Sequence, residues 1–204
     1  MGVDRHGSGP VGREGALEWW NTVEREHWRA SQCCPLMTTT HAELSSISVH
    51  TLKGEETTLG QYDGDVKLIV NVASRCGLAP QYEQLEALQR TYGDRGFTVL
   101  GFPSNDFLQE LGSDEAIQEY CSTTWGVSFP MFEKVRVNGR NRHPLYKELT
   151  QYPYENGKAG RIKWNFEKFV VTPDGKVSRF MPTVKPDDPT IIAAIESGLA
   201  AREA

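Results

Sequence analysis

The segment from residue 67 to residue 102 constrains the fold of this chain more than any other. Its first part, Lys67–Ala73, is a short apolar and β-branched run of the kind that forms a central strand. Its last part, Phe97–Phe102, is a second strand-like run. Between the two runs, apolar side chains recur at the spacing of one helix face, at Leu78, Tyr82, Leu85, Leu88 and Tyr92. A strand, a helix and a strand in this order predict a right-handed crossover between two parallel strands.

Further elements complete an α/β pattern on both sides of this unit. Before it, alternating residues on either side of the Lys53–Gly54 turn predict a hairpin over residues 47–59. After it, the predicted elements are a helix from Ser113, a short helix at His143–Leu149, a hairpin of Phe166–Thr172 and Lys176–Met181, and a helix from Asp188. This order resembles that of the thioredoxin-like fold, an α/β fold in which a central mixed β-sheet is flanked by helices.

The first 36 residues differ from the rest of the chain. They begin with a stretch rich in Gly, Arg and His, and they contain neither an apolar core segment nor a small-residue cleavage site, so they do not resemble a secretory signal. Met37, shortly after the adjacent pair Cys33–Cys34, resembles an alternative start. We predict that residues 1–36 are an extension, disordered or a start-site artefact, and that residues 37–204 form one thioredoxin-like domain.

The composition excludes several functional classes. The chain has 22 basic and 27 acidic residues, a net charge of −5 and no long Lys/Arg block, which argues against dedicated nucleic-acid binding. No run approaches the roughly 18 consecutive apolar residues of a membrane helix, so no stable membrane insertion is expected. Four cysteines without a Cys-x-x-Cys pair do not make a disulfide-stapled secreted scaffold. We therefore expect a small cytoplasmic enzyme or regulator.

Cys76 is the first candidate for chemistry. It follows the end of a predicted central strand and precedes the next helix, at the sheet edge where α/β proteins build their sites. A helix N-terminus favours the thiolate form of a cysteine, and Arg75 adds positive charge beside it. The alternative is a small buried hydrophobe. The position, with Gly77 giving room to the backbone, favours a reactive thiol.

Cys121 carries a weaker signal by itself. It lies on the apolar side of its predicted helix, where a core cysteine is the simpler interpretation. The two thiols are 45 residues apart in sequence, which excludes a local Cys-x-x-Cys site. If they form a bond, the helix that carries Cys121 has to move or partly unwind.

Three ordered segments carry a more specific signal: VNVASRCGL at residues 70–78, GFPSNDF at 101–107 and KWNFEKF at 163–169. They resemble the signatures of the glutathione peroxidase family, and the resemblance extends from about residue 45 to residue 198. The family uses a redox-active cysteine or selenocysteine together with a glutamine, a tryptophan and an asparagine. Motif by motif, the resemblance implies that these catalytic residues are Cys76, Gln109, Trp164 and Asn165.

The chain departs from the family pattern at two places. The segment Phe107–Gly112 is one residue shorter than the usual form, with Leu111 where proline is common, and Ser104 stands where a cysteine is usual. Cys121, in the segment 119–127, matches the resolving cysteine of the non-selenium, two-cysteine members that resemble thioredoxin-dependent peroxidases.

The resemblance implies a thiol peroxidase that reduces hydrogen peroxide and organic or lipid hydroperoxides. Cys76 is then oxidised to a sulfenic acid, Cys121 condenses with it to a disulfide, and thioredoxin reduces the disulfide. No metal, haem or nicotinamide is needed, and the short loop between Tyr152 and Trp164 implies a monomer. Two alternatives remain open: a glutathione-dependent peroxidase, and a sensor or relay that passes oxidation to a partner protein. An inactive binding module is disfavoured because all four catalytic-type residues are present.

Overall fold

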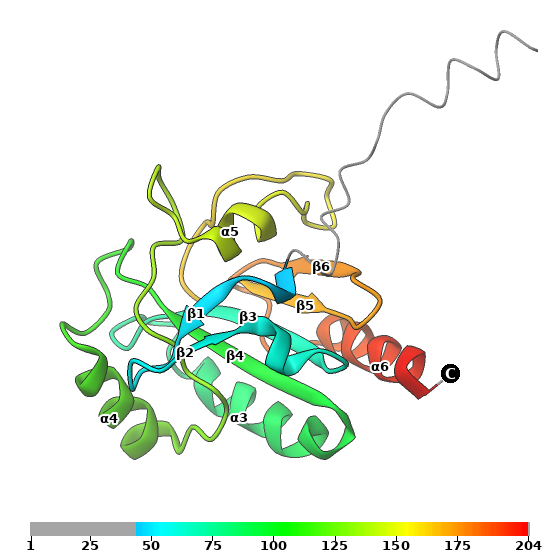
Figure 1. The fold of residues 1–204 in the computed structure, drawn as a ribbon, viewed down its shortest axis with the longest axis horizontal. Helices are drawn as coiled ribbons and strands as arrows, with labels where there is room; N and C mark the ends of the chain where they lie inside the picture. Colours follow the sequence, from blue (N-terminus) through cyan, green and yellow to red (C-terminus); the bar gives the residue numbers. More distant parts are fainter. Residues whose placement is uncertain (1–43, 204) are drawn as a thin grey trace, which may run out of the picture. The chain divides into compact units, whose positions relative to one another are not determined.

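The computed structural model describes residues 44–203, all of which belong to the unit Thr39–Ala204. The predicted extension of residues 1–36, with Cys33 and Cys34, lies outside the described residues, as does the start of the predicted domain. The elements, labelled as in Figure 1, are in chain order β1 (Ser48–His50), β2 (Glu56–Thr58), η1 (Leu59–Tyr62), β3 (Val66–Val72), α3 (Gln81–Tyr92), η2 (Gly93–Arg95), β4 (Phe97–Pro103), α4 (Asp114–Trp125), α5 (Pro144–Leu149), β5 (Lys168–Val171), β6 (Val177–Phe180) and α6 (Pro189–Glu203).

The predicted β-α-β unit is confirmed. Strands β3 and β4 lie side by side and are parallel, with Val66 opposite Phe97 and Val72 opposite Pro103. Every residue of both strands is buried, which explains their continuous apolar character, since a central parallel strand is covered on both faces. Lys67 is accommodated there because its ammonium group donates to the carbonyl of Tyr62 at 3.0 Å.

The second half of the domain adds antiparallel strands to the same sheet. Strand β5 pairs antiparallel with β3, and β6 pairs antiparallel with β5, so the sheet has the order β4-β3-β5-β6. The hairpin of β1 and β2 forms a separate two-stranded sheet. The mixed sheet and its strand order confirm the predicted thioredoxin-like fold.

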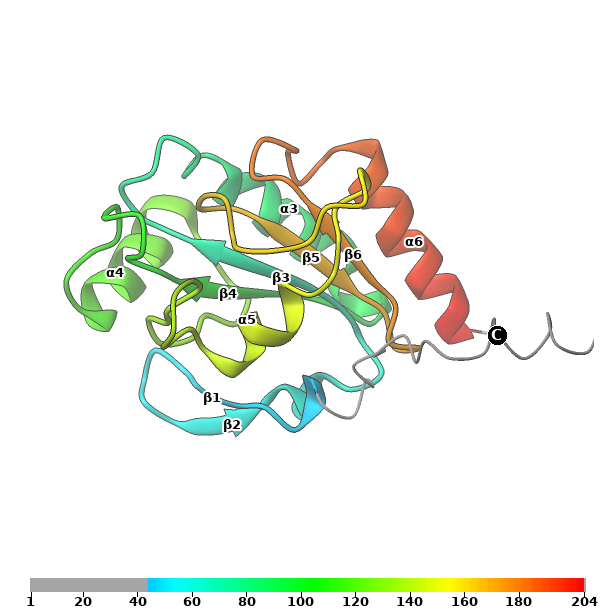
Figure 2. The ribbon, with the colours of Figure 1, turned by 90° about the horizontal axis from the view of Figure 1, so that it is seen from above.

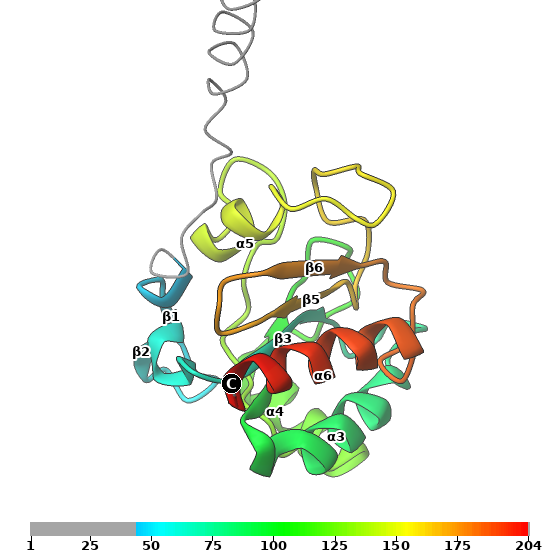
Figure 3. The same cartoon turned by 90° about the vertical axis from the view of Figure 1, so that its right-hand side faces the viewer.

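Helices α3, α4 and α6 lie on one side of this sheet and α5 on the other (Figures 2 and 3), and a hydrophobic cluster covers each face. Helices α3, α4 and α6 bury their apolar side chains in one cluster, and α5 and the β1–β2 hairpin lie over the other. Successive side chains of β4 point to opposite faces of the sheet, so Val99 belongs to the first cluster and Leu100 to the second. Gly198 allows α6 to approach the sheet, since a Cβ there would lie 2.8 Å from the side chain of Val66.

The helix starts agree with the sequence, and the start of β5 differs by two residues. Ser113 caps α4 by accepting a hydrogen bond from the amide of Ala116 at 3.3 Å. The strand predicted from Phe166 begins instead at Lys168. Phe166 has a φ of +66°, a left-handed conformation that interrupts extended backbone just before β5.

Candidate active site

Cys76 lies in the turn that follows β3, at the carboxyl end of the strand. Its side chain is buried, with 5% exposed, and its Sγ accepts a hydrogen bond from the amide of Leu78 at 3.4 Å. Residues 77–80 form a turn between Cys76 and the first residue of α3. A nearby backbone amide, rather than the end of the helix itself, is therefore the direct polar neighbour of the thiol.

Gln109 and Asn165 are brought together from distant parts of the sequence. The amide nitrogen of Asn165 donates to Oε1 of Gln109 at 3.0 Å. The main-chain carbonyl of Gln109 accepts a hydrogen bond from the amide of Arg75 at 2.8 Å, directly before Cys76. Through Gln109, which follows the second sequence motif, these two bonds connect the first motif to the third. Asn165 is fully buried, and its Oδ1 has no hydrogen-bond partner among residues 44–203.

The shortened loop before Gln109 closes through an unusual backbone conformation. Leu108 has a φ of +59°, in the left-handed region, and its amide donates to the carbonyl of Asn105 at 3.0 Å. A non-glycine residue in this conformation costs roughly 1–2 kcal/mol. The side chain of Leu108 is 86% exposed, so burial does not offset this cost.

Trp164 stands at the surface beside the Gln109 loop. Its side chain is 42% exposed, and its ring lies 4.9 Å from the ring of Phe107. The carbonyl of Trp164 accepts a hydrogen bond from Nδ2 of Asn71 at 3.0 Å, and Oδ1 of Asn71 accepts from the amide of Glu167 at 3.1 Å. Asn71 thus holds the turn that carries Trp164 and Asn165. Asn71 was not predicted as a site residue, although a polar amide side chain inside a buried strand indicates a structural or functional role.

Lys168 and Glu167 fix the same turn from its other end. The ammonium group of Lys168 donates to the carbonyls of Phe166 and Val184 at 2.6 Å each and of Pro182 at 3.2 Å. Glu167 accepts from the amide of Lys163 at 2.8 Å and pairs with the buried Arg179. The turn at residues 163–166 is therefore held by fully buried charged groups, which the sequence analysis did not identify.

The buried ammonium group leads to a prediction about pH. Burial lowers the pKa of Lys168 from 10.5 to about 7, although the charge of Glu167 opposes this shift. Between these two pH values the unfolded chain binds more protons than the folded one, so this group makes the unfolding free energy rise as pH increases. Urea denaturation between about pH 6.5 and 8.5 should show this rise, and Lys168→Met should reduce its slope. Lys176→Met, at an exposed position of the following hairpin turn, is the control, and equal slopes in all three proteins would contradict the assignment.

Cys121 is buried on the inner face of α4, with 2% of its side chain exposed. Burial raises the pKa of the Cys121 thiol to about 11; the adjacent Tyr82 hydroxyl acts in the opposite direction, and Glu110 adds to the increase. In the described part of the chain the Tyr82 hydroxyl has no oxygen or nitrogen partner, and the Tyr82 ring contacts Phe166, with centroids 5.3 Å apart. Cys76 and Cys121 are both free thiols. The sequence predicted Tyr82 only as an apolar residue of the helix face, whereas the residue also contacts the second thiol and the Trp164 turn.

Glu110 is a further buried group between the two cysteines. Its Oε1 accepts from the amide of Ser74 at 3.0 Å and from that of Leu111 at 2.7 Å, while Oε2 has no partner in the described protein. Burial raises the pKa of this carboxyl group. Its bond to Ser74 ties the Gln109 loop to the Cys76 turn a second time.

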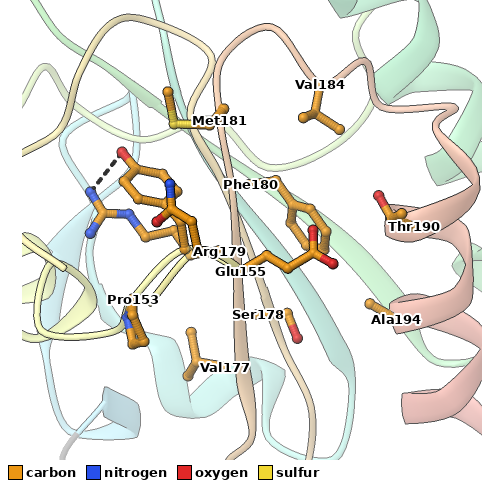
Figure 4. Close-up of a pocket in the computed structure, with 12 residues that line it drawn as sticks. Pro153, Glu155, Val177, Ser178, Arg179, Phe180, Met181, Val184, Thr190 and Ala194 are labelled. Carbon is orange, nitrogen blue, oxygen red and sulfur yellow. Dashed lines mark hydrogen bonds between the residues drawn. The ribbon is translucent and has the colours of Figure 1, made fainter. Parts of the chain in front are cut away.

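Two cavities lie away from the Cys76 thiol. The larger, about 680 Å³, opens between β6, α6 and the loop at residues 153–156, and Figure 4 shows Met181 and Phe180 on its wall. Arg179 also lines it, but its guanidinium group is already bonded to Glu167. The smaller, about 380 Å³, is lined by Cys121 and by the turn at residues 51–53. Across residues 44–203, no group of three or more His, Cys, Asp or Glu side chains is arranged to hold a metal ion, and no helix is long and apolar enough to span a membrane.

The chain is similar to known proteins over most of its length. Residues 44–150 match the glutathione peroxidase family. The thioredoxin/glutathione peroxidase BtuE of Escherichia coli (strain K12) is 53% identical, with 74% of this chain and 94% of that protein covered. The hydroperoxy fatty acid reductase gpx1 of Synechocystis sp. is 50% identical, with 74% of this chain and 92% of that protein covered.

Solved structures of other proteins also resemble this chain. The crystal structure of T. cruzi GPX1 superposes with a TM-score of 0.63 at 31% identity, with 78% of this chain and 97% of that chain covered. A thioredoxin family protein from Chlorobium tepidum shares the fold, with a TM-score of 0.58 at 19% identity and 77% and 95% coverage. These similarities show that the chain is a peroxidase and belongs to the glutathione peroxidase family.

Proposed function

We propose that this protein is a two-cysteine thiol peroxidase in which Cys76 reduces the hydroperoxide, Cys121 resolves the product and thioredoxin restores both thiols. One observation carries the proposal. The Cys76 turn, Gln109 and Asn165 form one hydrogen-bonded unit, and a second free thiol, Cys121, lies buried in the same hydrophobic cluster as Cys76.

In the first step, the thiolate of Cys76 attacks the terminal oxygen of the hydroperoxide. A sulfur–oxygen bond forms, the oxygen–oxygen bond breaks, and the sulfur gives up two electrons. The leaving alkoxide or hydroxide takes a proton and departs as an alcohol or as water, and Cys76 is left as a sulfenic acid. Hydrogen peroxide and organic or lipid hydroperoxides share this reacting group.

Gln109, Asn165 and Trp164 act as hydrogen-bond donors in this step. Oε1 of Gln109 is occupied by Asn165, so the NH₂ group of Gln109 faces the other way and is oriented to donate. The indole N–H of Trp164 is a donor only. Donors fixed in advance stabilise the thiolate and the charge that develops on the leaving oxygen.

In the second step, Cys121 attacks the sulfur of the sulfenic acid. The disulfide forms, the sulfur–oxygen bond breaks, and the hydroxide leaves as water with the proton that Cys121 gives up. The high pKa of the buried Cys121 keeps it protonated in the resting state, so it is unreactive toward peroxide until α4 opens. Helix α4 is weakly anchored, because its fully buried side chains are Ile117 and Cys121.

In the third step, thioredoxin reduces the disulfide by thiol exchange and supplies two electrons. The E. coli relative is named a thioredoxin/glutathione peroxidase, which supports thioredoxin as the reductant without excluding glutathione. The Synechocystis relative is named a hydroperoxy fatty acid reductase, which supports lipid hydroperoxides as substrates. We further propose that the protein acts as a monomer in the cytoplasm without a bound cofactor.

Peroxide-dependent oxidation of NADPH tests the proposal. The protein is assayed with thioredoxin and thioredoxin reductase, and in parallel with glutathione and glutathione reductase. We expect rapid turnover with thioredoxin and much slower turnover with glutathione. Turnover with glutathione alone would contradict thioredoxin recycling, and no turnover with either would favour a sensor that passes its oxidation to a partner protein.

A further inference from the structure

Leu108 combines two features that packing does not explain. It is 86% exposed, and its φ of +59° is unfavourable for a leucine. Glycine or asparagine would adopt this conformation at a lower cost and would expose less apolar surface. Residues in sparsely populated backbone conformations cluster at active sites and ligand-binding sites.

The surroundings of Leu108 place it at the peroxide site. The next residue, Gln109, is bonded to Asn165 through its side chain and to Arg75 through its carbonyl. The preceding residue, Phe107, contacts the ring of Trp164 at 4.9 Å. Leu108 and Trp164 are two of the three large hydrophobic side chains that are exposed in the described part of the chain.

We propose that Leu108, Phe107 and Trp164 form an apolar ledge at the Gln109 loop that binds the acyl chain of a fatty-acid hydroperoxide. This inference rests on the proposed peroxidase function of Cys76 and adds the surface that selects its substrate. Hydrogen peroxide needs no apolar surface, whereas a fatty-acid hydroperoxide carries its reacting group within a long apolar chain. Three side chains offer enough area for one chain but little for a membrane surface.

The ledge arises from the shortened loop. Because the segment Phe107–Gly112 lacks one residue of the usual family form, Leu108 stands directly between Phe107 and Gln109. Its left-handed conformation turns the chain there, and its side chain is left in solvent. An acyl chain lying on the ledge would cover Leu108 and Trp164 and recover the apolar contacts that the free protein lacks.

Two substitutions at one position test the proposal. Leu108→Asn removes the apolar side chain but tolerates the left-handed conformation, and Leu108→Met keeps an apolar side chain. The second-order rate constant for oxidation of reduced Cys76 is measured by stopped flow, without a reductant, for hydrogen peroxide and for monomeric linoleic acid hydroperoxide. We expect Leu108→Asn to lower the rate constant for the lipid about tenfold and to leave that for hydrogen peroxide within about twofold, since burying part of a leucine accounts for about one order of magnitude. Leu108→Met should retain most of the lipid rate.

Each other outcome overturns the inference. An equal loss with both substrates would show that Leu108 only shapes the Gln109 loop. An unchanged lipid rate would remove the ledge as a binding surface. A loss confined to phospholipid hydroperoxide in phosphatidylcholine vesicles would indicate a membrane contact, and a loss confined to thioredoxin-supported turnover would indicate a contact with the reductant. If neither substrate oxidised Cys76 in the unmodified protein, the proposed function itself would fail, which is a distinct result.

Discussion

Replacing Cys76 by serine is expected to abolish hydroperoxide reduction, with a loss of roughly four orders of magnitude or more, because a removed nucleophile has no substitute. A serine hydroxyl is not ionised at neutral pH, and it cannot be oxidised to an equivalent of the sulfenic acid. The measurement is the consumption of hydrogen peroxide by the reduced protein in a single turnover, with the mass of the protein recorded before and after.

The Cys76 test needs a control for general effects of cysteine removal. The double variant Cys33→Ser, Cys34→Ser removes the two cysteines outside the proposed site, and it should react at the rate of the unmodified protein. The Cys76→Ser protein should also remain folded, since the substitution exchanges one atom of a buried side chain. A Cys76→Ser protein that still consumed peroxide at a comparable rate would refute the assignment of the nucleophile.

Replacing Cys121 by serine should separate the two halves of the cycle. The first oxidation of Cys76 should proceed at an unchanged rate, because Cys121 takes no part in it. Thioredoxin-supported turnover should fall by about two orders of magnitude or more, since no intramolecular disulfide is available for exchange. The unprotected sulfenic acid should then accumulate as sulfinic and sulfonic acid under excess peroxide, which mass spectrometry would detect.

Two other residues of α4 provide a control variant and a spectroscopic probe for the Cys121 experiment. Ser122→Ala alters the exposed neighbour of Cys121 on α4 and should leave turnover unchanged. Trp125, near the end of the same helix, stacks on Tyr82 with ring centroids 6.2 Å apart, so opening of α4 should change its fluorescence. That change should follow oxidation in the unmodified protein. Full thioredoxin-dependent turnover in Cys121→Ser would rule out the resolving role.

The sequence predicted the order and pairing of the main strands because hydrophobic periodicity reflects burial directly. The apolar runs of β3 and β4 and the helical spacing of α3 identified the parallel unit, and the structure contains it at nearly the predicted bounds. The assignment of Phe166 to a strand was wrong. Its side chain is apolar and buried as a strand residue would be, but its backbone is left-handed, which composition does not reveal.

The candidate site was predictable only in part. The motifs identified Cys76, Gln109, Trp164 and Asn165 as residue types in a recognised order, without indicating which of them touch. The buried supports Asn71 and Lys168 were not predicted, since each acts on main-chain carbonyls that are close in space but not in sequence.

The sequence by itself determined the fold class and the family and predicted the reacting residue types, because these depend on periodicity and on short local motifs. The tertiary structure decided the contacts. It joined Gln109 to Asn165 across 56 residues, buried Cys121 on the inner face of α4, and left Leu108 exposed next to Gln109. These contacts depend on how distant segments pack around a buried hydrogen-bond network. The loss of one residue from a loop changes that packing, and no local sequence pattern predicts the change.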